Sequence, residues 1–180
     1  MGRTLKEKGE FEYRRTISLR GYRKEEMKQS EKISENKDYT AVNLGCMDEI
    51  KNHSLIHPKS GEEVKGKVFL KELTKATGTE ISFTSLPPKN ELGYFHIHNQ
   101  DEETYIIIKG TGFYQVNDDC FPIKEGSVIR VAPEGVRSLC NTSDEDMVYI
   151  CVQSKMNSLE EHTTDDGSRV VYESKLKELL

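Results

Sequence analysis

The sequence predicts an all-β domain, folded as an antiparallel sandwich or a small barrel. Short runs rich in β-branched and aromatic residues follow one another at close spacing, and Gly, Pro, Asn or Asp residues close each run. No long helical pattern interrupts these runs. With 180 residues, of which 34% are hydrophobic and 32% charged, the chain is long enough for one modest core beneath a very polar surface.

The expected strands begin after a lead-in at 41–63, which combines a short apolar run with a helical turn. In "QVNDDCF" and in "TSDEDMV" the Asn and Asp residues predict hairpin turns, because these residues tolerate left-handed dihedral angles. Beyond residue 165 we expect a turn, one more strand and a short amphipathic helix. The earlier strands are expected at 66–74, 80–86, 93–98, 104–110, 112–116, 120–126, 127–135, 137–141 and 146–153.

The chain divides into four expected segments: a polar N-terminal extension at 1–40, the lead-in at 41–63, a barrel at 64–173 and a helical tail at 174–180. Residues 1–26 hold eight Lys or Arg and five Glu without apolar periodicity, which predicts a solvated arm, loosely ordered or weakly helical. An arm that binds nucleic acid or an acidic partner is the alternative. A third interpretation is that the native chain starts at Met27, because "RKEE" before it can be encoded by a purine run that resembles a ribosome-binding site.

Charge and hydropathy exclude several classes of protein. The net charge of -5 argues against a general nucleic-acid binder. The longest apolar runs, "YIII" and "MVYICV", are far shorter than the roughly 20 residues that span a bilayer, so we expect no membrane partner. The N-terminus shows no secretory signal, and the four cysteines form no CxxC motif, so we expect reduced thiols in a cytoplasmic protein.

The segment "HIHNQDEETYIIIKGTG" carries the residues most suited to chemistry. Side chains two apart in a strand point to the same face, so His96 and His98 project together, and a short turn brings Glu103 of the next strand to meet them. Two imidazoles and a carboxylate suit a divalent transition metal, and with open coordination positions they suit non-haem Fe(II). Zn, Mn and Ni also fit. Glu102 is the alternative carboxylate if the turn is one residue tighter.

At these residues the sequence resembles the cupins, small β-barrels whose site lies inside the barrel. The pattern HxHx4E, followed after six residues by Gly110, is similar to their first motif. The second motif resembles "GSVIRVAPEGVRSLCN" in Gly126, in the Pro133-x-Gly135 turn and in Asn141. The resemblance covers residues 64–153 and implies a cupin-like double-stranded β-helix, that is, a jelly-roll barrel.

Three positions depart from the cupin pattern. Asn90 stands where the family has a glycine, and it can still adopt a left-handed turn. One extra residue before Pro133 predicts a β-bulge. Where the resemblance implies a third histidine ligand, the chain has Ser138, a poor metal ligand, so the metal depends on His96, His98 and Glu103.

Four further residues are candidates for binding a ligand in the barrel. Tyr105 points inward by alternation and can donate a hydrogen bond, although an inward aromatic residue is more often core. Arg137 can clamp a carboxylate with two hydrogen bonds, although solvated arginine is commoner. Ser138 lies at the position of the third histidine, and Cys140 on the same strand face offers a thiolate or, more commonly, core packing.

Two classes of function fit these residues. The first is an enzyme of dioxygenase or isomerase type that uses a divalent metal on a small anionic or sugar-like metabolite. The second is a binding or sensing cupin with a degenerate metal site, which the missing histidine favours. The resemblance also implies a homodimer, in which the strand "GKVFLKEL" exchanges with a second chain. A nucleic-acid-binding regulator would need a helical reading domain that this length does not provide.

Overall fold

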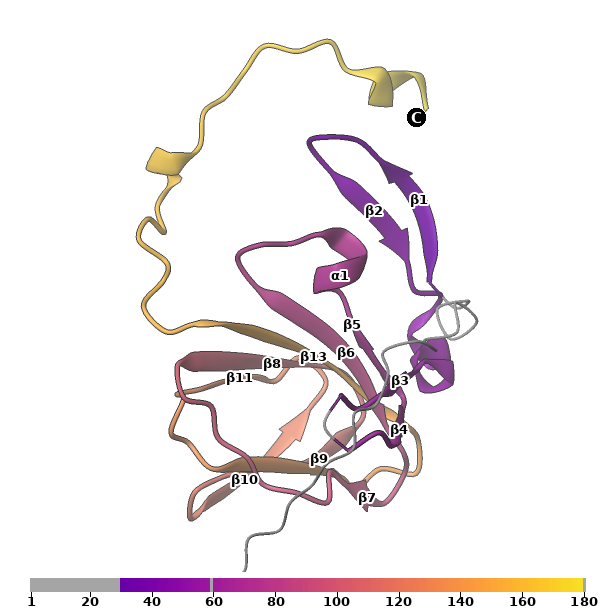
Figure 1. The fold of residues 1–180 in the computed structure, drawn as a ribbon, viewed down its shortest axis with the longest axis vertical. Coiled ribbons are helices and arrows are strands. Elements are labelled where there is room, and N and C mark those ends of the chain that lie inside the picture. Colours follow the sequence, from indigo (N-terminus) through magenta and orange to yellow (C-terminus); the bar gives the residue numbers. More distant parts are fainter. Residues whose placement is uncertain (1–29, 59, 180) are drawn as a thin grey trace, which may run out of the picture.

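Two facing antiparallel sheets form the body of the protein in the computed structural model, which describes residues 30–58 and 60–179 (Figure 1). One sheet contains β5 (Lys67–Phe69), β6 (Glu80–Leu86), β8 (Asp101–Lys109), β11 (Val128–Val131) and β13 (Met147–Lys155), in the order β11-β8-β13-β6-β5. The other contains β7 (Asn90–Glu91), β9 (Thr111–Val116), β10 (Asp119–Lys124) and β12 (Arg137–Asn141), in the order β10-β9-β12-β7. The all-β prediction is therefore confirmed.

The core lies between the two sheets and follows from the alternation of side chains along the strands. In β8 every second residue from Glu103 to Ile107 is buried, and the residues between them are more exposed. Each inward row meets the inward row of the opposite sheet, as in other packed pairs of sheets. The buried core residues are Leu86, Tyr105, Ile107, Tyr114, Ile123, Val131, Leu139, Met147, Tyr149 and Cys151.

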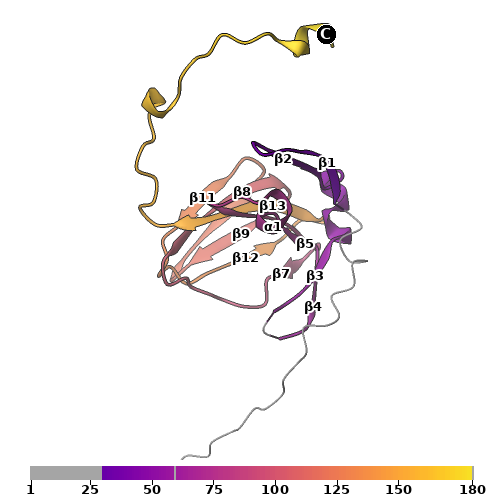
Figure 2. The same cartoon turned by 45° about the horizontal axis from the view of Figure 1, so that its top comes forward.

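A second, smaller cluster covers the outer face of the five-stranded sheet. Leu44, Ile50 and Val148 are its buried members. They bring together the 3-10 helix η1 (Met47–Asn52), the helix α1 (Lys71–Thr74) and the sheet, beside the short hairpin of β3 (Ser54–Ile56) and β4 (Glu63–Lys65) (Figure 2). The helical turn expected in the lead-in is thus present as η1. Within the described part of the chain, no helix is long and apolar enough to cross a membrane.

Part of the segment assigned to a polar extension forms a hairpin instead. β1 (Glu31–Glu35) pairs with β2 (Thr40–Asn43), and the hairpin stands away from the barrel (Figure 1). Its turn is fixed locally, because the Asn36 side chain accepts a hydrogen bond of 2.8 Å from the amide of Asp38. The expected arm at 1–26 and the alternative start at Met27 lie outside the described residues.

Two expected strands before residue 100 are shorter than predicted. The run 66–74 is strand only over β5 and then turns into α1, because the Glu80 carboxylate accepts hydrogen bonds from the amides of Leu70 and Lys71. The run 93–98 is extended but has a single bridge, between His96 and Arg137. Sequence periodicity does not show which backbone groups find a partner strand.

The predictions for turns and for the end of the chain were right in part. The β9–β10 hairpin is present, with Asn117 at φ 53°. The segment "TSDEDMV" joins strands of different sheets and is not a hairpin. The expected β-bulge in 127–133 is absent, since β11 pairs regularly with β8, and a register shift lies instead between Val148 and Tyr149.

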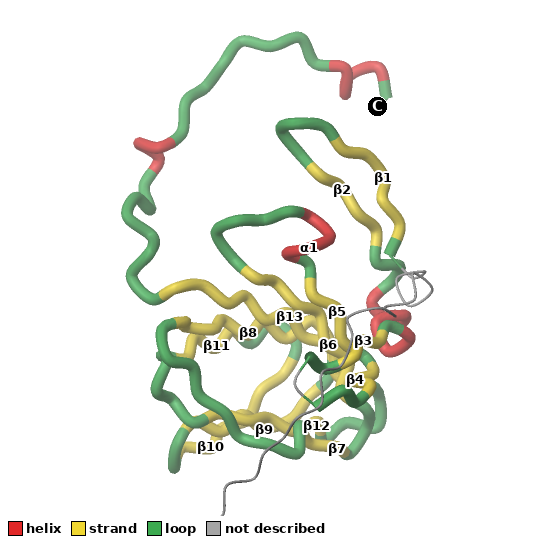
Figure 3. The backbone as a smooth tube through the Cα atoms, viewed as in Figure 1, coloured by secondary structure: helices red, strands yellow, loops and turns green. Residues whose placement is uncertain are grey.

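The strand expected after residue 165 does not form. Val170, Val171 and Tyr172 are largely exposed, and none of the described strands pairs with them. The last 24 described residues, after β13, run around the outside of the barrel with two short 3-10 turns, η2 (Thr164–Asp166) and η3 (Lys175–Glu178) (Figure 3). The helical tail is therefore one 3-10 turn and no α-helix.

Candidate metal centre

The two histidines are positioned by backbone hydrogen bonds to the segment that leads into β12. The amide of Arg137 donates to the carbonyl of His96 at 3.1 Å, and the amide of His96 donates back at 3.3 Å. The amide of His98 donates to the carbonyl of Pro133 at 2.9 Å. These bonds hold an extended backbone without a full strand ladder, so the two side chains still point the same way.

The structure brings together the three residues that the sequence analysis singled out. One ligand atom from each of His96, His98 and Glu103 lies within 4.8 Å of the others. The Nε2 atom of His98 is 3.1 Å from Oε1 of Glu103, and the Nε2 atom of His96 is 3.5 Å from Oε2. The alternative carboxylate, Glu102, is instead bonded to the exposed guanidinium of Arg130 and has no part in the cluster.

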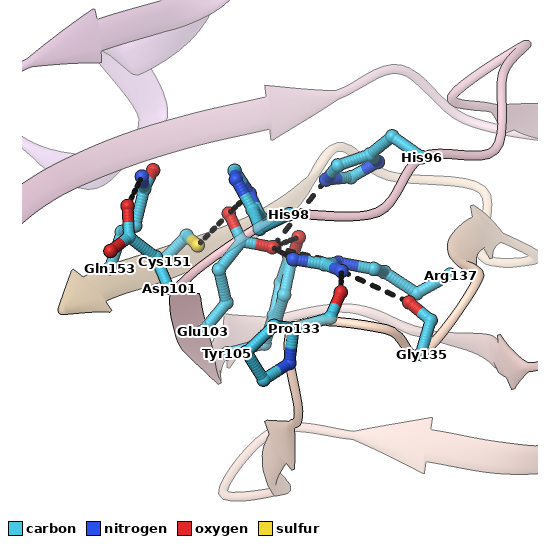
Figure 4. Close-up of polar contacts among 10 residues, drawn as sticks. All are labelled: His96, His98, Asp101, Glu103, Tyr105, Pro133, Gly135, Arg137, Cys151 and Gln153. Carbon is cyan, nitrogen blue, oxygen red and sulfur yellow. Dashed lines mark hydrogen bonds and ion pairs between the residues drawn. The ribbon is translucent and has the colours of Figure 1, made fainter. Parts of the chain in front are cut away.

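A network of donors surrounds the carboxylate of Glu103 (Figure 4). Its Oε2 atom accepts a hydrogen bond of 2.8 Å from the Tyr105 hydroxyl and two from Arg137, at 3.0 Å from Nε and 2.8 Å from Nη2. Its Oε1 atom accepts from the Cys151 thiol at 3.4 Å. Oε2 therefore accepts three hydrogen bonds, whereas Oε1 accepts only that of the thiol and faces His98.

The charge state of Glu103 is set by these contacts. Burial by itself would raise the pKa of the Glu103 carboxyl, but the neighbouring His96, Arg137 and Tyr105 outweigh it and hold that pKa far below its usual range. The carboxylate is thus ionised at neutral pH. Burial raises the pKa of the Cys151 thiol to about 12, with a further contribution from Glu103, so Cys151 is a neutral donor.

Arg137 has a different place from the one that its sequence context suggested. Its side chain is 0% exposed, and Nη1 donates to the carbonyls of Pro133 and Gly135 at 3.0 Å each. The guanidinium thus donates to two backbone carbonyls and also forms an ion pair with Glu103. Arg137 is therefore the residue of the second motif whose side chain points toward the cluster. The sequence analysis gave that position to Ser138.

Ser138 and Cys140 are not brought to the cluster. Along β12, Arg137, Leu139 and Asn141 point into the barrel, so the residues between them point to the outer face. There Ser138 and Cys140 line a shallow hollow with Phe113 and Gln115. The resemblance places the third-ligand position at Ser138, whereas the residue of β12 that faces the cluster is its neighbour Arg137. The difference of one residue arises at the turn around Gly135, where strand alternation does not hold. The inward position of the apolar Leu139 was the signal that would have placed Arg137 correctly.

The residues present fit a divalent metal ion. Nε2 of His98 and Nδ1 of His96 are buried nitrogen atoms with no hydrogen-bond partner among the described residues. Buried polar atoms of this kind are rare and need an explanation, and a metal on Nε2 of His98 provides one. The histidine side chains remain about a quarter exposed, at 27% for His96 and 25% for His98, so an ion and a small molecule can reach them.

Comparison with known proteins agrees with the fold and the motif. A family model described as "Cupin domain" matches residues 82–153. A cupin protein from Bacteroides fragilis of known crystal structure is 33% identical, with a TM-score of 0.56 over 58% of this chain and 89% of that chain. A Cupin 2 conserved barrel domain protein from Salinispora arenicola, 16% identical with a TM-score of 0.50, covers 64% of this chain and 91% of that one and has the same fold. No curated protein matches the sequence. The chain therefore belongs to the cupin family and has its double-stranded β-helix barrel.

Proposed function

We propose that this protein binds a small molecule inside the cupin barrel, next to a divalent transition metal held by His96, His98 and Glu103. One observation carries the proposal: Nε2 of His98 is buried and unpaired while it lies 3.1 Å from Oε1 of an ionised carboxylate. An imidazole nitrogen and a carboxylate oxygen this close together can serve as neighbouring ligands of one cation. Iron, manganese, nickel and zinc all accept this set of ligands.

The other residues of the cluster support that role. Arg137 and Tyr105 engage Oε2 of Glu103, which fixes the carboxylate plane, and Oε1, which accepts only the weak hydrogen bond of the Cys151 thiol, can bind an ion. With three protein ligands, a metal retains open coordination positions that a small molecule can fill. When bound there, the ion would act as a Lewis acid or activate oxygen, which suits an isomerase or a dioxygenase.

A second function, binding of a small molecule without metal, is favoured by Arg137. The guanidinium is a permanent positive charge at 2.8 Å from Glu103, so the carboxylate already has a counter-ion. A nearby positive charge also weakens the attraction of the site for a second cation. In this alternative the protein is a metabolite binder or sensor, and its histidines donate hydrogen bonds to the ligand.

Elemental analysis of untagged protein, prepared with supplements of iron, manganese, nickel and zinc, separates the two functions. The variants are His96→Ala, His98→Ala and Glu103→Gln, and His162→Ala in the exposed tail is the matched control. We expect near-stoichiometric metal in the wild type and in His162→Ala and a loss in the three site variants. A wild type without metal after supplementation would favour the metal-free binder.

A further inference from the structure

The inner face of the five-stranded sheet remains polar from the metal cluster to the edge strand β5. Residues directly opposite each other on neighbouring strands share a face. Cys151 of β13 lies opposite both Tyr105 and Ser82, and Thr84 lies opposite both Tyr149 and Lys67. Ser82 and Thr84 are buried, at 4% and 6% exposure. A row of hydroxyl and thiol groups therefore leads from Glu103 to Lys67, inside the barrel.

Lys67 stands at the end of this row, and no described carboxylate pairs with it. Its ammonium forms no ion pair or hydrogen bond with any described residue and lies 4.9 Å from the centre of the Phe69 ring. The side chain is half-buried, and burial lowers its pKa although Glu103 and Glu80 oppose the shift. Both oxygens of Glu103 already accept hydrogen bonds, and Glu80 binds two amides at the start of α1. A partly desolvated cation without a partner is costly unless an anion binds it.

The charges around the cluster point in the same direction. Arg137 and Lys67 are two cations facing this part of the interior. The carboxylates Glu103 and Glu80, both opposite Gln153 on the same face, already accept hydrogen bonds from protein donors. Asp101, further along the same face, hydrogen-bonds Gln153 at 2.7 Å and lies at the end of the barrel. Lys67 is thus a positive charge on this face that no described carboxylate bonds directly, and a metal ion would add a second one. Such a site concentrates anions.

We propose that the small molecule bound here is an organic anion, and that Lys67 binds its carboxylate while the rest of the molecule fills the barrel beside His96 and His98. The inference rests on the proposed binding function and adds the class of ligand. Oγ1 of Thr84, directly opposite Lys67, is a buried hydroxyl oxygen without a partner among the described residues. It supplies a second hydrogen bond to the same carboxylate, beside the ammonium.

Isothermal titration calorimetry with malonate and with its neutral analogue malonamide tests this inference, on metal-loaded protein and on protein treated with a chelator. Lys67→Met removes the charge and keeps an unbranched side chain of similar length. Lys65→Met, an exposed lysine on β4, is the matched control. We expect the wild type and Lys65→Met to bind malonate alike, Lys67→Met to bind it about ten-fold or more weakly, and malonamide to bind weakly to all. The metal content of Lys67→Met should equal that of the wild type.

Each other result has a distinct meaning. Equal malonate affinity in the wild type and in Lys67→Met overturns the role of Lys67, and malonamide binding as tight as malonate binding overturns the anion class. A wild type that loads metal but does not bind malonate overturns this inference and leaves the metal site standing. Lys67-dependent malonate binding in a protein that never loads metal supports the inference and removes the metal from the proposed function.

Discussion

At the scale of single residues, the sequence predicted which side chains converge but not the full set of their neighbours. His96, His98 and Glu103 were identifiable because two-residue alternation and one short turn decide their directions. The sequence predicts a ligand carboxylate or solvent as the partner of Arg137, whereas its pairing with Glu103 depends on how two sheets face each other across the barrel. Contacts of that kind arise from tertiary structure, and no local pattern in the sequence encodes them.

The register of β12 gives a prediction about metal affinity. Arg137→His replaces the inward guanidinium with an imidazole that faces the cluster, which adds a ligand and removes a positive charge. We expect it to bind zinc at least about ten-fold more tightly than the wild type in a competition titration with a chromogenic chelator.

Ser138→His is the control for this change, because the same new side chain points to the outer face there. Its zinc affinity should equal that of the wild type. A gain of affinity in Ser138→His, and none in Arg137→His, would show that the inward and outward faces of β12 are assigned the wrong way round.

Tyr105 provides a second prediction at this scale. Tyr105→Phe removes the 2.8 Å hydrogen bond to a buried, ionised carboxylate while it keeps the ring in the core. We expect the free energy of unfolding to fall by about 1.5–3 kcal/mol, as for other hydrogen bonds to charged groups. Tyr39→Phe, whose hydroxyl bonds Ser34 at the surface, should change it by less than about 1 kcal/mol in the same urea titration.

At the scale of secondary structure, the sequence predicted strands well where a partner strand exists and poorly where none does. The runs that became β6, β8, β9, β12 and β13 combine alternation with neighbours on both sides, so local and tertiary preferences agree. The run around Val170 has similar residues but pairs with none of the described strands, and it remains irregular. Asp101, which lies before the expected strand 104–110, begins β8 and accepts a hydrogen bond from Gln153.

Gly110, between β8 and β9, gives a prediction about the connection of two strands. Its φ is 95°, and a Cβ atom there would lie 2.9 Å from Cα of Met147. Gly110→Val should therefore lower the free energy of unfolding by about 3 kcal/mol or more, from strain and backbone contact together. Gly78→Val, where a side chain would meet open space, is the control for the substitution itself. Equal thermal stability of Gly110→Val and the wild type would contradict the prediction.

At the scale of the whole molecule, the barrel and the C-terminal tail are separate in energetic terms. The residues after β13 are mostly exposed and bury no core side chain. Removal of residues 159–180 should change the free energy of unfolding by no more than about 0.5 kcal/mol, measured by urea titration. Removal from Met147 onward also deletes β13, the central strand of its sheet, and should abolish folding.

The assembly of the protein is open to a direct measurement. We propose a homodimer, because β5 is a short edge strand that pairs with β6 alone and can pair or exchange with a second copy. Light scattering after size exclusion should then give twice the chain mass of 20.6 kDa. A mass of one chain at all concentrations tested would overturn the proposal.

The ion pair between Glu103 and Arg137 also bears on the order of events during maturation. Small domains in which the metal ion neutralises its charged ligands unfold when the ion is removed. Here a guanidinium fixed within the chain balances the buried carboxylate. The polypeptide can therefore fold before it binds the metal ion. A chelator would then remove the ion reversibly, and the folded apoprotein could bind metal again.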